Sequence, residues 1–465
     1  MFEDVHKVYA ENLAIVHDEG QNFTYGDLEE FKIKISSVIP SRSLIFTLCD
    51  NNIESLAGYY SFIRNKIVPL MLDRDITDDS LLNLCDIYKP SFLWLPTIRA
   101  DLFNSKDILF SYLDYSLVEM EQKQEYELYP ELALLLTTSG STGSPKLVRI
   151  SYLNLEENSK SIVEYLSLRE DEKAITVLPI HYSFGLSIIN SHFVIGATIL
   201  LTNKTIIQRE FWDFFKENKA TSLSGVPYTF EILKKIKFFD MELENLKTIT
   251  QAGGKMNSDL SKEFVEFCER NQKRMFIMYG QTEATARMSY LSPENSSKKI
   301  GSIGVAIPGG RFHLIDESGN LINKNNTMGE LVYEGRNVSL GYADSELDLK
   351  KGDVNEGFLK TGDLATRDEE GFYYIVGRNK RFIKIFGNRV NMDEIENLIK
   401  SITNDVACSG SDDNMLIYVV EDNLEDKIKE LIIEKTGINF RGFKIKKINR
   451  IPRTASGKTS YKDLS

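Results

Sequence analysis

The sequence is poor in the residues that usually mark metal centres and disulfide frameworks. Its 465 residues include only four cysteines and five histidines. The cysteines lie far apart, and neither they nor the histidines show the spacing of a zinc site. We therefore expect reduced cysteines and no structural zinc.

Long apolar runs and a positive charge balance are also missing. The longest apolar stretches, such as Val194 to Leu201, are far too short to span a bilayer. The N-terminus is charged and lacks the apolar core of a signal peptide. The net charge is −12, which argues against a nucleic-acid partner. These absences predict a cytoplasmic protein with no membrane span.

The length and the pattern of apolar runs predict an α/β protein of more than one domain. A chain of 465 residues exceeds what one hydrophobic core usually holds. Over residues 1–130, apolar strand-like runs alternate with helix-like segments, which is typical of parallel sheets covered on both faces. Short β-like runs between Gly301 and Tyr342 predict a small antiparallel subdomain.

The most informative stretch runs from Thr137 to Lys146, Thr-Thr-Ser-Gly-Ser-Thr-Gly-Ser-Pro-Lys. Apolar runs precede and follow it, which predicts a strand, a tight polar loop and a second strand. Glycines, hydroxyls and a terminal lysine, with no acid among them, could cradle a polyphosphate. The loop is not a Walker A loop, because its lysine follows Ser-Pro. The alternative interpretation is a Ser/Gly-rich surface turn.

Two later apolar runs end in polar residues. Thr248 to Lys255 ends in a glycine pair, which lets the backbone approach a flat ligand closely. Met275-Phe-Ile-Met-Tyr-Gly-Gln-Thr-Glu delivers Tyr279, Thr282 and Glu283 at the carboxyl end of a strand, where α/β sheets bind ligands.

The last third of the chain adds an acid and a basic segment. Asp363, in Thr-Gly-Asp, has two acceptor oxygens and suits a vicinal diol. From Phe440 to Lys462 there are eight Lys or Arg residues and no acid. This segment is either a solvated basic edge or a positive surface for phosphates. It contains Pro452-Arg-Thr-Ala-Ser-Gly-Lys458.

In their order and separation, these motifs resemble those of the ANL superfamily of adenylate-forming enzymes. That superfamily includes acyl- and aryl-CoA synthetases, peptide-synthetase adenylation domains and firefly-type luciferases. The resemblance implies a large α/β N-terminal domain, residues 1–379, of αβ-sandwich subdomains plus the small antiparallel β subdomain. It also implies a mobile, small α+β C-terminal domain, residues 380–465.

The resemblance further implies an ATP-dependent ligase of small carboxylic acids. Such an enzyme uses ATP and Mg²⁺ to convert the acid to acyl-AMP, with release of pyrophosphate. It then transfers the acyl group to a phosphopantetheine thiol, on CoA or on a holo carrier protein. We expect the carrier protein ahead of CoA, and the acid itself stays undetermined.

Each motif carries residues whose roles the resemblance implies. The catalytic residues are Lys146, Thr282, Glu283, Lys384 and Lys458, with Glu283 as the Mg²⁺ ligand. The nucleotide-binding residues are Thr138, Ser139, Gly140, Ser141, Thr142, Gly143, Gly253, Gly254, Tyr279, Gly280, Asp363 and Arg378. The acid pocket is formed by Tyr182, Ser183, Tyr228 and Ala252. The hinge is Lys380, and the thiol channel contains Gly387 and Arg389.

Ser183 bears on the class of acid. Peptide-synthetase domains usually carry an aspartate at this position to pair with the substrate's ammonium. A buried ammonium without a carboxylate partner is costly, so Ser183 argues against an α-amino acid. An amino-acid adenylation enzyme stays an alternative. So do an enzyme that stops at the adenylate or oxidises it, and a non-catalytic nucleotide-binding module.

Overall fold

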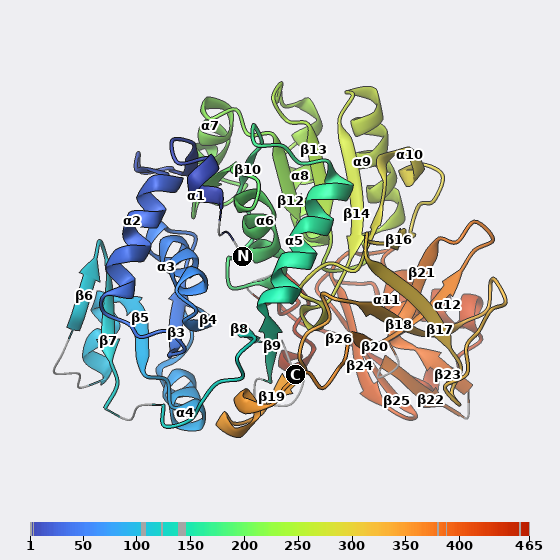
Figure 1. Cartoon of the computed structure of the whole chain (residues 1–465). Coiled ribbons are helices and arrows are strands. Elements are labelled where there is room, and N and C mark those ends of the chain that lie inside the picture. Colours follow the sequence, from blue (N-terminus) through green and yellow to red (C-terminus); the bar gives the residue numbers. More distant parts are fainter. Residues whose placement is uncertain are drawn as a thin grey trace.

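The computed structural model describes the chain except residues 1, 3, 104–107, 122–123, 138–145, 379–380, 387, 455–456 and 465. Two large sheets and their helices form the body of the molecule, in blue to yellow in Figure 1. A small antiparallel sheet and a C-terminal α+β unit lie beside this body, in gold to red. This arrangement confirms the α/β fold class and the small antiparallel β region.

The first large sheet has eight strands in the order β19-β9-β8-β4-β3-β5-β7-β6. The strands are β3 (Leu44–Cys49), β4 (Val68–Asp73), β5 (Phe92–Pro96), β6 (Ile108–Tyr112), β7 (Tyr115–Glu119), β8 (Leu132–Thr137), β9 (Leu147–Ser151) and β19 (Tyr342–Ala343). The central strands β5, β3, β4 and β8 pair in parallel. Strands β6 and β7 pair antiparallel, because the short link between them cannot make a crossover.

The second large sheet has nine strands in the order β16-β15-β14-β13-β12-β10-β11-β1-β2. The strands are β1 (Leu13–His17), β2 (Asn22–Thr24), β10 (Lys173–Ile175), β11 (Thr198–Leu201), β12 (Ser222–Gly225), β13 (Thr248–Gln251), β14 (Arg274–Tyr279), β15 (Ser289–Leu291) and β16 (Val305–Ala306). From β14 to β1 all neighbours pair in parallel. Their carboxyl ends therefore share one edge, where ligands bind in α/β folds.

Helices fill the space between the large sheets and cover their outer faces. They are α1 (Val5–Val8), α2 (Tyr25–Ser36), α3 (Ile53–Arg64), α4 (Asp78–Tyr88), α5 (Tyr152–Leu166), α6 (Ser183–Phe193), α7 (Arg209–Glu217), α8 (Pro227–Lys235), α9 (Ser258–Arg270) and α10 (Pro293–Ser296). Residues of α2, α3, α5 and α6 share one core with strands of both sheets. Helix α4 packs on the other face of the first sheet, and α7, α8 and α9 on the other face of the second. Within the described ranges, no helix combines the length and apolar character needed to cross a membrane.

Local sequence explains where the helices near the site begin. Ser151 at the end of β9 and Asn154 form a reciprocal capping box, which starts α5 directly after the strand. Thr24 and Asp27 do the same for α2. Pro227 lies in the first turn of α8, where its missing N–H costs nothing. These local signals therefore set the first residues of α2, α5 and α8.

The small sheet is antiparallel, in the order β17-β18-β20-β21. Its strands are β17 (Gly310–Ile315), β18 (Gly329–Gly335), β20 (Phe358–Arg367) and β21 (Tyr373–Arg378). The antiparallel region predicted between Gly301 and Tyr342 therefore extends further, to Arg378. The motif residues Asp363 and Arg378 lie on β20 and β21, and the sequence motifs did not show that these two strands pair.

The C-terminal unit has its own core. Its elements are β22 (Phe382–Ile385), β23 (Asn388–Asn391), α11 (Met392–Ile399), β24 (Val406–Ser411), β25 (Asn414–Val419), α12 (Glu425–Thr436) and β26 (Phe443–Lys447). Apolar residues from β22 to β26 and from both helices form one cluster, separate from those of the large sheets. The domain boundary predicted at residue 379 adjoins residues outside the described ranges and stays a prediction.

Arg149 ties β9 to the segment around β19. Its side chain is fully buried. It donates hydrogen bonds to the carbonyl oxygens of Leu340, Tyr342, Lys351 and Gly352. One guanidinium thus satisfies a turn of chain whose carbonyls would otherwise be buried without donors.

Replacing Arg149 with methionine is expected to lower the free energy of unfolding by about 3 kcal/mol, because several buried carbonyls lose their donors. The measurement is urea unfolding followed by far-UV circular dichroism. Arg336→Met is the control, because Arg336 is 67% exposed and its guanidinium pairs with the Glu157 carboxylate at 3.4 Å. An equal loss of unfolding free energy in the two variants would contradict the stabilising role of the Arg149 hydrogen bonds.

Candidate active site

The predicted residues converge at the carboxyl edge of the second sheet. Lys458 lies there beside the glycine pair that follows β13: its Nζ is 5.2 Å from the ring centroid of Tyr182. A Cβ at Gly253 would lie 2.8 Å from Tyr182 Oη and 3.6 Å from Lys458 Cε. A Cβ at Gly254 would lie 3.3 Å from Pro227 Cγ. Both glycines therefore allow close packing of the chain around Lys458.

A short hairpin presents Lys458. Thr454 N–H donates to the Lys458 carbonyl at 2.8 Å, and Gly457 N–H donates to the Thr454 carbonyl at 2.8 Å. Gly457 has φ +77°, which favours glycine at this turn. The hairpin packs on the start of α8, since the Arg453 guanidinium lies 4.4 Å from the ring centroid of Tyr228.

Asp363 is the centre of a buried polar cluster. It is 3% exposed. Its carboxylate accepts hydrogen bonds from Tyr279 Oη at 2.5 Å and from Gln281 Nε2 at 3.0 Å. The register of β20 and β21 places Arg378 opposite, with Nε 3.2 Å from Asp363 Oδ1. Burial and the adjacent Asp363 charge raise the pKa of Tyr279 well above its usual value, so the phenol stays a donor.

Glu283 faces a tyrosine that the sequence analysis missed. Tyr342 Oη donates to Glu283 Oε1 at 2.7 Å, and Lys146 Nζ lies 5.3 Å from the Tyr342 ring centroid. Burial and the nearby Glu283 charge raise the pKa of Tyr342. Next to Glu283, Thr282 Oγ1 lies 3.1 Å from Ser183 Oγ. Tyr342 belongs to no motif, so nothing in the sequence pointed to it.

The Glu283 carboxylate suits Mg²⁺ held mainly by phosphate oxygens. Oε2 of Glu283 has no hydrogen-bond partner among the described residues. In the same ranges, no three His, Cys, Asp or Glu side chains gather as a metal cage. Mg²⁺ commonly takes one or two protein carboxylates and keeps water and phosphate as its other ligands. Glu283 is the residue that would hold such an ion.

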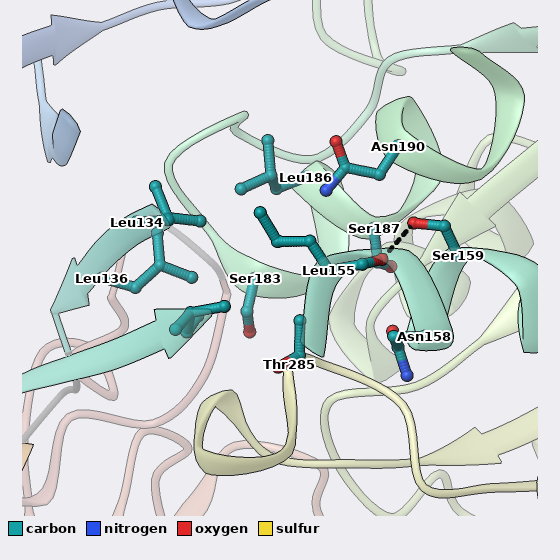
Figure 2. A pocket seen from close by; sticks show the side chains of 11 residues that line it. Leu134, Leu136, Leu155, Asn158, Ser159, Ser183, Leu186, Ser187, Asn190 and Thr285 are labelled. Atoms are coloured by element: carbon teal, nitrogen blue, oxygen red, sulfur yellow. Dashed lines mark hydrogen bonds between the residues drawn. The ribbon is translucent and has the colours of Figure 1, made fainter. Parts of the chain in front are cut away.

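The four predicted pocket residues come from three elements around Lys458. Tyr182 precedes α6 and Ser183 begins it, Tyr228 lies in the first turn of α8, and Ala252 follows β13. Ser183 also lines a small cavity of about 10 Å³ between β8, α5 and α6, which has room for about one water molecule (Figure 2). No carboxylate lines this pocket among the described residues.

Some predicted residues lie elsewhere or outside the described ranges. Lys384 is on β22, where its backbone N–H donates to Asp412 Oδ1 at 2.7 Å. None of its described contacts reaches the polar cluster around Asp363. Gly280 lies at the end of β14, where a Cβ would be 1.6 Å from the Ala286 carbonyl oxygen. Outside the described residues are Thr138, Ser139, Gly140, Ser141, Thr142, Gly143, Lys380, Gly387 and the side chain of Arg389.

Comparison with known proteins decides the family. The family described as AMP-binding enzyme matches residues 2–343. The chain belongs to the family of AMP-binding enzymes. This AMP-binding enzyme is an ATP-dependent, AMP-forming ligase that adenylates a carboxylic acid and transfers the acyl group to a thiol. ATP, Mg²⁺ and a phosphopantetheine thiol are its cofactors and co-substrates.

Two relatives of this AMP-binding enzyme have names that describe ligases of an aromatic acid and CoA. A 2-succinylbenzoate–CoA ligase of Listeria monocytogenes is 28% identical over 344 residues, covering 71% of this chain and 69% of the relative. An indoleacetate–CoA ligase of Aromatoleum aromaticum is 26% identical, covering 72% and 67%. The structure of O-succinylbenzoate coenzyme A synthetase from Bacillus subtilis with AMP superposes with a TM-score of 0.83 at 21% identity, covering 100% and 97%. That last likeness shows the shared fold.

Asp363→Asn in this AMP-binding enzyme is expected to raise the Kd for ATP about 10- to 100-fold, because an amide loses the charge that pairs with Arg378. Isothermal titration at fixed Mg²⁺ measures the Kd. Asp316→Asn serves as the control, since Asp316 is an exposed acid that accepts hydrogen bonds within its own turn. An unchanged Kd in Asp363→Asn would remove Asp363 from nucleotide binding.

Proposed function

We propose that the enzyme joins a small carboxylic acid other than an α-amino acid to CoA, with Lys458 as the catalytic cation of the first step. The position of Lys458 carries the proposal. Its ammonium lies over the ring of Tyr182, and its Cε would be 3.6 Å from a Cβ at Gly253, which places Lys458 beside the predicted acid pocket. In the first step a carboxylate attacks a polyanion, so neutralisation of charge is the main task of the protein.

The remaining roles follow the same charge logic. Lys146 and Glu283 with its Mg²⁺ would hold the β- and γ-phosphates as pyrophosphate leaves. Asp363 and Arg378 would bind the ribose. In the second step, the C-terminal domain, residues 380–465, would rotate about Lys380, which withdraws Lys458 and brings the thiol channel around Gly387 to the adenylate.

The proposal of CoA replaces the earlier preference for a carrier protein. Two curated relatives carry CoA in their names, which supports CoA as the acceptor. A carrier protein stays the second candidate because Lys444 and Lys446 are exposed and share one face of β26, which gives a basic surface that suits acidic partners as well as phosphates. We also propose a cytoplasmic enzyme, since all four cysteines are unpaired and buried, as in reducing compartments.

The test of function is acid-dependent pyrophosphate release from ATP. The panel contains short-chain, hydroxy, aromatic, fatty and amino acids, with hydroxylamine to trap the adenylate. We expect turnover with acids that lack an α-ammonium. Turnover with amino acids alone would contradict the reading of Ser183, and ATP binding without turnover on any acid would contradict the proposed function.

Lys458→Ala is expected to lower pyrophosphate release by about 100- to 1,000-fold, because the developing negative charge loses a preorganised cation. Thioester formation from supplied acyl-AMP should stay close to that of the unsubstituted enzyme, since Lys458 leaves the site for that step. Stopped-time assays of the two half-reactions measure this. Lys462→Ala, an exposed lysine four residues further on, is the control. Equal loss of both half-reactions would overturn the assignment.

The acceptor is tested by titrating thioester formation with CoA and with a holo carrier protein. Saturation by CoA at micromolar concentration is the expected result. Neutralising β26 with Lys444→Gln and Lys446→Gln should raise the KM for CoA and weaken the salt dependence of that KM. Saturation by the carrier protein alone would replace CoA as the acceptor.

A further inference from the structure

Arg287 is a buried charge without an acidic partner. It is 2% exposed and lies eight residues after Tyr279, beyond η3 (Thr282–Ala284). Its Nε donates to Ser187 Oγ at 3.0 Å, and its Nη1 donates to Tyr165 Oη at 3.1 Å and to Met278 Sδ at 3.3 Å. All three acceptors are neutral. No described carboxylate forms an ion pair with Arg287, and its Nη2 donates to no described residue.

An anion would compensate the charge of Arg287, which has fewer neutral acceptors than the buried Arg149. A guanidinium stays charged in proteins and carries five N–H donors. Burying a charge among neutral groups is costly unless an opposite charge compensates it. The ring of Phe184, with its centroid 5.0 Å from the Arg287 Cζ, supplies only a partial compensation. A methionine or leucine would fill the same volume without the cost, so packing alone does not account for arginine.

The backbone holds Arg287 in a fixed position. Thr285 and Ala286 before it have φ of 54° and 96°, a conformation that non-glycine residues rarely adopt. The Arg287 carbonyl accepts hydrogen bonds from Asn158 Nδ2 at 2.9 Å and Asn337 Nδ2 at 3.1 Å. Strain of this kind persists only where the surroundings enforce it, and it concentrates at functional sites.

Helix α6 connects Arg287 with the reaction centre. Ser183 lies beside Thr282, and Ser187 lies beside Arg287. The two serines are four residues apart, so they share one face of the helix, about 6 Å apart along its axis. Both also line the pocket shown in Figure 2. Arg287 therefore lies about one helical turn further than Ser183 from the phosphate-binding motif.

We propose that Arg287 binds a second carboxylate on the acid substrate, at the end away from the carboxylate that is adenylated. The substrate class is then a dicarboxylic acid whose two carboxylates are several bonds apart. This inference rests on the proposed function, because it takes the reacting carboxylate to lie near Lys458. Serines at positions 183 and 187 leave this face of α6 without an acid that would repel a second negative charge.

The first test uses the unsubstituted enzyme and matched pairs of acids. The pairs are glutarate with pentanoate, adipate with hexanoate, and 2-succinylbenzoate with its analogue that lacks the ring carboxylate. We expect kcat/KM for pyrophosphate release to be about 100-fold higher for the best diacid than for its monoacid, as for a charge-assisted pair. Equal or better use of the monoacids would overturn this inference and leave the proposed function standing. If none of the acids gives pyrophosphate release, both this inference and the proposed function are overturned.

The second test substitutes Arg287. Arg287→Gln should remove the preference for the diacid, mainly through KM, with the KM for ATP unchanged. Arg274→Gln is the matched control, because Arg274, at the start of β14, also donates to the neutral oxygens of Thr248 and Leu166. Retention of the preference in Arg287→Gln, or equal losses for both acids, would overturn the inference.

Arg287→Lys decides the matter if the glutamine variant does not fold. Lysine keeps the charge but not the planar fork. A raised KM for the diacid alone would support the assignment of Arg287 to the second carboxylate. Equal changes for both acids of a pair would overturn it.

Discussion

The reversal of the chain after β14 is the constraint on which the active site depends. A Cβ at Gly280 would lie 1.6 Å from the Ala286 carbonyl oxygen, so only glycine allows the two arms to pack together. Asn337 joins the arms by donating to the carbonyls of Ala284 and Arg287, at 2.8 and 3.1 Å. One short stretch of chain thereby presents Thr282 and Glu283 near the start of the turn and the buried Arg287 at its end. The position of each group depends on the same closed turn.

The charges of the site are divided between positioned acids and cations from different elements. Asp363 is held by a phenol, an amide and Arg378, and Glu283 is held by the phenol of Tyr342. The neutral phenols and the amide orient the carboxylates without neutralising their charge, and Arg378 pairs with Asp363 as a cation. The cations Lys146 and Lys458 come from distant parts of the sequence. A preorganised arrangement of this kind stabilises charge as it develops, because the protein need not reorganise during the reaction.

The sequence predicted the parts of the site that depend on local spacing. Tyr279, Thr282 and Glu283 follow one strand, so their common position was predictable from the strand end. Asp363 and Arg378 came from separate motifs, and the register of β20 and β21 showed that they face each other. Residue contacts across the fold were not predictable in this way. Tyr342 reaches Glu283 over 59 residues of sequence without any motif.

Arg287 illustrates the same limit for buried charge. In the sequence it is one basic residue between apolar and small neighbours, a pattern equally typical of an exposed strand position. Its burial results from the packing of α5 and α6 against the turn after β14, through Tyr165 and Ser187. These partners are 122 and 100 residues away in sequence. Only the assembled fold reveals that its charge has no acidic partner among the described residues.

Arg378 joins the polar cluster around Asp363 to the C-terminal unit. Its side chain pairs with Asp363 on β20, while its backbone N–H donates to Asp393 in the first turn of α11, at 3.2 Å. The proposed rotation about Lys380 would break the second contact and leave the first, because β20 and β21 belong to the same sheet. Asp363 and Arg378, which we propose bind the ribose, would then stay in place while Lys458 withdraws. Two successive reactions at one bound nucleotide require this independence, and the register of two adjacent strands provides it.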